Sequence, residues 1–303
     1  MTNVAPEIAT ESHQAAVAQA ESLDGAGASR RNLTFILAVA WLVLVVVVVL
    51  LGWIFGDALP FLQDPTEINP DSISAGPSWS HPFGNAAFGE DVFSQVVEGG
   101  LLSLRIAALV TVLGIGIGGG MGLIAGYYRG LIDSLVRLVI NVTLSVPALL
   151  LVIFIVTIRN QSEVTVIFAL TLLAVPALAR IVRASTLQVA DREFVKAAEV
   201  LGVKRSKILL REVLPNVMPT LVSFAFLTTG IIIVVESTLS FLGLSVQAPA
   251  ITWGSIIASG RIKFADAPHT VIMPSLVIFL TVLSLNFVGD QLLKRFDIKE
   301  TSL

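Results

Sequence analysis

A short charged segment interrupts a chain that is otherwise strongly apolar, and its side chains are the first candidates for chemistry. The segment runs from Asp191 to Gly202 and continues to Leu214-Pro215-Asn216. The apolar stretches around it hold no paired acids, no nucleophile beside a base and no metal cluster, so catalysis is not indicated. Charged groups between two lipid-compatible stretches require water or a protein partner. The segment therefore predicts an interaction surface.

The pattern within this segment predicts a short helix, a break and a second short helix. Asp191 is placed as the N-cap and Gly202 as the C-terminal stop, and the second helix can start at Ser206. The apolar residues at helical spacing are Phe194, Val195, Ala198 and Leu201.

Small residues would let another protein approach the first short helix closely. The small residues are Ala197, Ala198 and Gly202, and the polar residues beside them are Arg192, Glu193, Lys196 and Glu199. A closely packed centre with a polar rim is typical of contacts between proteins. The alternative is a solvated loop that lies along the membrane surface without a partner.

The composition places the chain in a lipid bilayer. Hydrophobic residues make up 55% of the chain, charged residues make up 14%, and the mean hydropathy is +0.87, whereas soluble proteins carry about 25% charged residues. Six apolar stretches are long enough to cross a membrane, for which about 20 residues suffice. They lie at about 33–56, 100–126, 136–157, 164–186, 214–236 and 271–292. With no cysteine, the chain can form neither disulfides nor thiolate metal sites.

The positions of the cations predict the orientation, because cytoplasmic loops are enriched in Lys and Arg. Most of the 19 Lys and Arg residues, including those of the charged segment, share one side of the membrane with the N-terminus. The loop before the second span, 57–98, carries acidic residues and no Lys or Arg. We therefore expect both termini and the charged segment in the cytoplasm.

Four parts are expected along the chain. Residues 1–30 lack a strong apolar pattern and predict a disordered cytoplasmic tail rather than a signal peptide. Residues 31–98 form the first span, which acts as an anchor, and an acidic extracellular loop. Residues 99–297 hold the other five spans, and residues 298–303 form a cytoplasmic C-terminal tail.

Glycines and prolines shape the predicted spans. Gly114, Gly118, Gly122 and Gly126 stand at four-residue spacing in the second span. Such a strip allows another helix to pack closely, whereas a phosphate-binding glycine loop would need a preceding strand, and no Walker motif occurs. Pro147, Pro176, Pro219 and Pro274 are expected to bend the later spans. The bends either serve a moving pathway or only shape the bundle.

Glu236 and Trp253 are the two candidates for a gate or a translocation pathway. Ionisable groups within lipid are costly and often functional, but Glu236 lies near the outer end of the fifth span, where it could simply stabilise the helix end. Asp290 has the same two interpretations at the inner end of the sixth span. Trp253 fits the aromatic belt at a membrane surface, or an external gate between the fifth and sixth spans. No metal site is predicted, because the three histidines lack ligand spacing.

The charged segment resembles the EAA loop of bacterial ABC importer permeases. That pattern is Glu-Ala-Ala, three residues, Gly, nine residues, Ile, one residue and Leu-Pro. Here it stands as Lys196-Ala197-Ala198, Gly202, Glu212 and Leu214-Pro215. The alanines, the glycine and Leu-Pro match at the expected spacing, while lysine replaces the glutamate and glutamate replaces the isoleucine.

Further segments resemble the second permease subunit of dipeptide, oligopeptide and nickel importers. They are His81-Pro82-Phe83-Gly84, Gly89-Glu90-Asp91-Val92, 122–128, 239–244, Trp253-Gly254 and Gly289-Asp290. Asn141 stands where that group usually has aspartate. The resemblance covers about residues 79–297.

The resemblance implies an all-α integral membrane protein with six transmembrane helices, a type I ABC importer permease fold. It implies a second permease subunit, two ABC ATPases that hold ATP and Mg, and an extracytoplasmic substrate-binding protein, with no cofactor in this chain and no nucleic-acid partner. The residues expected to contact an ATPase are Arg192, Glu193, Phe194, Ala197, Ala198 and Gly202. Peptides are the first expectation for the cargo. The alternative function is a self-sufficient secondary carrier or channel.

Overall fold

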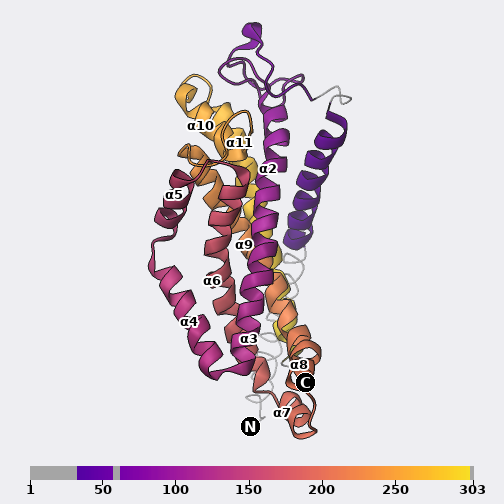
Figure 1. Ribbon diagram of the computed structural model, residues 1–303. Coiled ribbons are helices and arrows are strands. Elements are labelled where there is room, and N and C mark those ends of the chain that lie inside the picture. Colours follow the sequence, from indigo (N-terminus) through magenta and orange to yellow (C-terminus); the bar gives the residue numbers. More distant parts are fainter. Residues whose placement is uncertain (1–32, 57–61, 301–303) are drawn as a thin grey trace, which may run out of the picture.

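The protein is an elongated bundle of long helices (Figure 1), seen here in a computed structural model that describes residues 33–56 and 62–300. Five helices in this part are long and apolar enough to cross a membrane, and a bent helix pair makes up to six. The spans are Leu33–Phe55, Val92–Tyr128, the pair Gly130–Ser145 and Ala148–Ile158, Glu163–Ala190, Arg205–Phe241 and His269–Arg295. No strand occurs among the described residues, so the all-α expectation is confirmed. The predicted tail 1–30 lies outside them, as do residues 301–303.

The second span begins earlier than predicted and is not a uniform α-helix. It consists of α2 (Val92–Leu113), the π-helical segment η3 (Gly114–Gly119) and α3 (Gly120–Tyr128). Asp91 caps α2 by accepting a hydrogen bond from the backbone N–H of Ser94 at 2.7 Å. That cap begins the helix eight residues before 100, the predicted start, because hydropathy alone does not register a polar first turn.

The third span, predicted as one helix over 136–157, is two helices with a sharp break. The segments α4 (Gly130–Ser145) and α5 (Ala148–Ile158) meet at an angle of 81°. Val146 adopts an extended conformation before Pro147, as residues that precede proline do. In Figure 1 the pair bows away from the rest of the bundle. Pro147 therefore breaks its span, as expected of a proline in a helix interior.

The remaining spans are continuous. The fourth is α6 (Glu163–Ala190), and the fifth runs through α8 (Arg205–Ile208), the π-helical segment η4 (Leu209–Val213) and α9 (Leu214–Phe241). The sixth, α11 (His269–Glu300), extends beyond the predicted end at 292. Pro176, Pro219 and Pro274 lie inside α6, α9 and α11. Among the candidate spans of the described residues, the only one broken by a bend of more than 40° is the pair at Pro147.

One end of the bundle carries the short helix α7 (Glu193–Val200), and we call it the α7 end (Figure 1). The opposite end carries α10 (Trp253–Gly260), the 3-10 turn η5 (Arg261–Lys263) and the loop 62–91 with its 3-10 turn η2 (Pro70–Ser72). His81 Nδ1 lies 3.1 Å from Asp91 Oδ1, and His269 Nε2 lies 3.1 Å from the carbonyl oxygen of Asn85. These contacts hold the loop against α2 and α11.

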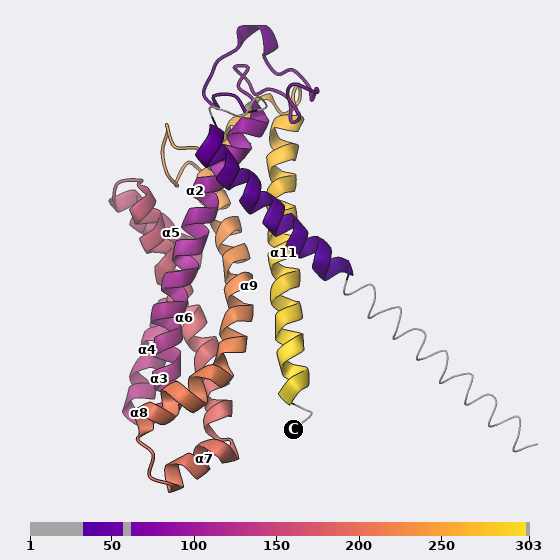
Figure 2. The same cartoon turned by 90° about the vertical axis from the view of Figure 1, so that its right-hand side faces the viewer.

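Two apolar clusters form the core. The larger joins α2, α6, α9, α10 and α11, and it includes Ile106, Leu170, Ile233 and Trp253. The smaller lies at the α7 end and joins α3, α6, α7 and the start of the fifth span. The first span crosses the outside of the bundle (Figure 2) and buries little of its surface. The second cluster is the part of the core on which α7 rests.

Candidate functional site: the short helix at the end of the bundle

The segment between α6 and α7 is held by an ion pair rather than by the predicted cap. Arg129, which follows α3, lies 2.8 Å from the Asp191 carboxylate. Asp191 is the C-cap of α6, and the N-cap of α7 is Arg192, without a side-chain cap bond. The prediction that Asp191 is the N-cap of the short helix is therefore wrong. The carboxylate turns toward a cation 62 positions earlier in the chain, which a local pattern does not reveal.

Gly202 ends α7 in the left-handed conformation, with a φ of 74°. Its N–H donates to the carbonyl of Glu199 at 3.0 Å, and the N–H of Val203 donates to the carbonyl of Ala198 at 3.1 Å. This pair of bonds is the Schellman arrangement that closes a helix C-terminus. A side chain at this position would be strained by the positive φ, which explains the glycine. The second short helix begins at Arg205, one residue before the expected start at Ser206. It is not separate from the fifth span, as expected, but continues into it, so that this span begins at Arg205 rather than at about 214.

The two faces of α7 have different surroundings. Val195 is 1% exposed and belongs to the core cluster at the α7 end, and Ala198 packs against that cluster. On the other face, Phe194 is 38% exposed, while Val200 and Leu201 are 89% and 81% exposed. A helix that buries one apolar face and leaves another in the open has a surface for a further partner.

The other predicted contact residues of α7 lie where an approaching protein could touch them. Glu193 and Ala197 are exposed, Arg192 is half-buried, and Gly202 is exposed at the turn. Ala197, one turn from both Phe194 and Leu201, sits in the middle of the exposed apolar face. Ala198 instead belongs to the buried side, so a bulky residue there would disturb the folding of α7 as well as its outer surface.

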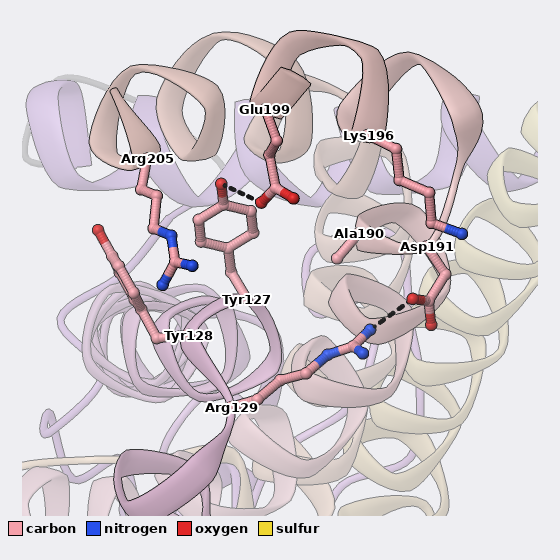
Figure 3. A pocket seen from close by; sticks show the side chains of 8 residues that line it. All are labelled: Tyr127, Tyr128, Arg129, Ala190, Asp191, Lys196, Glu199 and Arg205. Atoms are coloured by element: carbon pink, nitrogen blue, oxygen red, sulfur yellow. Dashed lines mark hydrogen bonds and ion pairs between the residues drawn. The ribbon is translucent and has the colours of Figure 1, made fainter. Parts of the chain in front are cut away.

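A polar cavity of about 300 Å³ lies between α7 and the ends of α3 and α6 (Figure 3). It is lined by Tyr127, Tyr128, Arg129, Ala190, Asp191, Lys196, Glu199 and Arg205. The Tyr127 hydroxyl donates to Glu199 Oε1 at 3.3 Å, so α7 is hydrogen-bonded directly to α3. Lys196 and Glu199, predicted as rim residues of a partner contact, face this cavity.

All four glycines of the predicted strip meet α6. A Cβ at Gly114 would lie 2.9 Å from Leu178 Cδ1, and one at Gly126 would lie 2.9 Å from the carbonyl oxygen of Arg183. At Gly122 the nearest atom would be the carbonyl oxygen of Ala179 at 2.5 Å, and at Gly118 it would be that of Val175. The four-residue spacing predicts one turn of α-helix between successive glycines, but Gly114 and Gly118 lie in the π-helical segment η3. The glycines allow backbone contact between the second and fourth spans.

Glu236 and Trp253 lie together at the opposite end of the bundle, and both are fully buried. Glu236 accepts hydrogen bonds from the hydroxyls of Ser240, Ser245 and Ser103 at 2.8, 3.0 and 3.3 Å. The Trp253 indole donates to the carbonyl oxygen of Val96 at 2.9 Å. Glu236 therefore does not reach toward a surface, and Trp253 is not part of an aromatic belt. The expectations of an interfacial Glu236 and of a Trp253 in the aromatic belt are therefore wrong, because partners such as Ser103 and Val96 come from a distant part of the chain. A role of Glu236 or Trp253 in a gate or pathway stays a prediction.

The structure also reveals an ion-pair cluster near the α7 end that the sequence interpretation missed. Asp133, in the first turn of α4, forms a two-pronged ion pair with Arg183 of α6, and Arg137 lies 3.3 Å from the same carboxylate. Asp133 was detectable as the one acid at the start of the third span. Its partner Arg183 could not be identified from the sequence, because the two residues lie 50 positions apart. The contact fixes the outer helix pair to the central helices near the α7 end.

Buried helix contacts, lipid-length spans and a protruding helix with an open apolar face define a multi-pass membrane protein with a surface for a partner. A family model described as "Binding-protein-dependent transport system inner membrane component" matches residues 118–300. The chain belongs to this family, which confirms the family resemblance found in the sequence.

Curated relatives and solved structures agree with this assignment. The chain is 36% identical to the glutathione transport system permease protein GsiD of Pectobacterium atrosepticum, over 76% of each chain. It is 36% identical to the dipeptide transport system permease protein DppC of Alkalihalophilus pseudofirmus, over 78% of each. An inward-facing structure of the MetNI methionine ABC transporter matches with 18% identity and a TM-score of 0.56, covering 67% of this chain and 97% of that chain. The type I importer permease fold expected from the sequence is thereby confirmed.

Proposed function

We propose that this chain is one of two permease subunits that form the translocation pathway of an ATP-driven importer for short peptides. In this proposal the α7 end faces the cytoplasm, where two ATPase subunits bind ATP and Mg. The opposite end receives cargo from an extracytoplasmic binding protein. Residues 99–297 form the transporting unit, while the first span anchors the chain.

The exposed apolar face of α7 carries this proposal. Phe194, Val200 and Leu201 are open in the single chain, whereas Val195 of the same helix is buried in the core cluster. Exposed apolar side chains at the tip of a membrane protein, away from lipid, are favourable only against a partner. An ATPase groove that accepts Ala197 at its centre would bury them, with Arg192 and Glu193 at the rim.

The contacts between α7 and the ends of the second and fourth spans would transmit a movement of α7 to these spans. Glu199 is hydrogen-bonded to Tyr127 of α3, and Asp191 is paired with Arg129 directly after α3. The α3 helix is in turn packed on α6 through the glycine strip. A displacement of α7 would therefore move the second and fourth spans together, as a rigid unit can in a two-state transporter.

The proposed cargo rests on the named relatives. One is named for glutathione, a tripeptide, and another for dipeptides. The chain covers most of both relatives at 36% identity, so short peptides are the cargo class that these relatives support.

A cross-linking experiment tests the contact directly. The chain has no cysteine, so Ala197→Cys introduces a single reactive thiol on the outer face of α7. When the complete transporter carries a second thiol in the α7-facing groove of its ATPase, we expect an ATPase–permease adduct whose yield changes with bound ATP. Ser134→Cys, exposed on α4 near the same end, is the matched control. An equal yield from both positions contradicts docking at α7.

A further inference from the structure

The polar cavity behind α7 contains more positive than negative groups. It is lined by three cations, Arg129, Lys196 and Arg205, and by two carboxylates, Asp191 and Glu199. Arg129 is neutralised by Asp191 at 2.8 Å, and Glu199 accepts from Tyr127. In the described part of the chain neither Lys196 nor Arg205 forms an ion pair.

The cavity lies at the level where three spans end. Tyr128 is the last residue of the second span, Ala190 is the last of the fourth, and Arg205 is the first of the fifth. All three residues line the cavity. Basic pockets between spans on the cytoplasmic side of a membrane hold anionic lipid headgroups, whose anion is phosphate.

The lining suits a group with several acceptor oxygens. Figure 3 shows Arg205 and Lys196 on opposite sides of the space, with the Tyr127 ring and the Glu199 carboxylate between them and Arg129 directed at Asp191. A phosphate oxygen can accept from a guanidinium on one side while another accepts from an ammonium or a phenol on the other. The cavity is lined by one more cation than carboxylate, so one negative charge on a bound phosphate would balance it.

We propose that this cavity is a phosphate site, occupied by the headgroup of an anionic phospholipid. The bound phosphate draws Arg205, at the start of the fifth span, toward Lys196 on α7 and the end of α3. It thereby stiffens the connection between α7 and the spans behind it. Inorganic phosphate from the aqueous phase shares the same chemistry and is the second source to be distinguished. The proposal does not depend on the cargo or on ATP coupling.

Lipid retention by the full-length protein tests the site. Phosphatidylglycerol is titrated into the detergent-purified chain, and native mass spectrometry measures the fraction that keeps one lipid. Phosphatidylcholine, whose choline cation cancels the phosphate charge, is the zwitterionic reference. The pocket variant is Lys196→Gln with Arg205→Gln. The control is Lys207→Gln with Arg211→Gln, which removes two exposed cations from the next turns. Each lost charged contact is expected to weaken phosphatidylglycerol binding by about tenfold.

A loss of phosphatidylglycerol binding in the pocket variant but not in the control supports the site and shows that its phosphate comes from a lipid. Displacement of the lipid by inorganic phosphate, or phosphate binding without lipid, supports the site with a soluble source. Equal losses in both double variants, or no loss in either, overturn the proposal. Arg205→Lys keeps the positive charge and should keep most of the phosphatidylglycerol binding. If Arg205→Lys also loses the lipid, the loss reflects a disturbed fold rather than a missing charge, and the proposal is overturned.

Discussion

The hydroxyl of Tyr127, at the end of the second span, donates a hydrogen bond to Glu199 of α7 across 72 positions of the chain. This 3.3 Å contact joins the exposed helix to the bundle. Together with the pair between Arg129 and Asp191 it makes α7 an extension of the spans behind it rather than a loose loop. The proposed coupling depends on that rigidity.

Tyr127→Phe should uncouple transport from ATP hydrolysis without unfolding the protein. A single hydrogen bond of this kind contributes about 1 kcal/mol, which changes an equilibrium by about fivefold. We expect several-fold less peptide uptake for each ATP hydrolysed, measured in vesicles that contain the complete transporter. Tyr128→Phe removes a hydroxyl from the adjacent residue, whose ring packs edge-on against Tyr127, and should retain normal coupling. Identical ratios for both variants would refute a special role for Tyr127.

Gly118→Ala should destabilise the bundle, because the new methyl group would collide with the carbonyl oxygen of Val175 in α6. Overpacking of this kind costs about 1–3 kcal/mol. Gly120→Ala is the matched control, since its added Cβ would meet no atom within 4 Å apart from the backbone of its own helix and its chain neighbours. Thermal unfolding in detergent should show a lower midpoint for the Gly118 variant alone. If both variants unfold at the wild-type temperature, the glycine strip is not a tight contact.

Ser103→Ala should weaken the end of the bundle opposite α7. The Ser103 hydroxyl donates to Glu236 and accepts from the backbone N–H of Trp253 at 3.1 Å. Its removal leaves a buried N–H without this acceptor, at a cost of about 1–3 kcal/mol. Ser259→Ala removes a hydroxyl that bonds only within its own helix turn, to Ile256. Hydrogen exchange of α10 should increase for the Ser103 variant and stay near wild type for the Ser259 variant; the reverse order would exclude this network as the support of α10.

Asn141→Asp should hold α4 more firmly against α6. The Arg180 guanidinium donates to the Asn141 side-chain oxygen at 3.5 Å, a long contact with a neutral acceptor. A carboxylate would make the bond charge-assisted and about twice as strong. The unfolding midpoint should rise by about 2 °C or more. The gain should disappear when Arg180→Gln is added, and a gain that survives this second change must have another origin.

The sequence predicted the spans and the exposed helix because both depend on local composition. An apolar run of 20 residues is visible without knowledge of its neighbours, and the glycine at position 202 reports a helix end by its own conformational freedom. In both cases the residues that give the signal belong to the helix that is predicted, or directly follow it.

Features that depend on distant residues could not be predicted. The burial of Glu236 requires a donor from Ser103, 133 positions earlier. Asp191 forms an ion pair with Arg129 instead of capping α7. Ala198 faces inward because it packs on the core cluster at the α7 end. The π-helical segments η3 and η4 leave no mark in hydropathy. The errors at Glu236, Asp191 and Ala198 concern residues whose environment is set by distant parts of the chain.

The most direct test of the central claim is uptake of labelled short peptides by sealed vesicles. One set contains the full-length chain alone, and another contains it with the second permease, the ATPases and the binding protein of its transport system. We predict uptake only in the complete set, only with ATP, and abolished by Ala197→Trp on the outer face of α7. Sustained uptake by the chain alone without ATP, or full uptake by the Ala197→Trp transporter, would contradict the proposed mechanism.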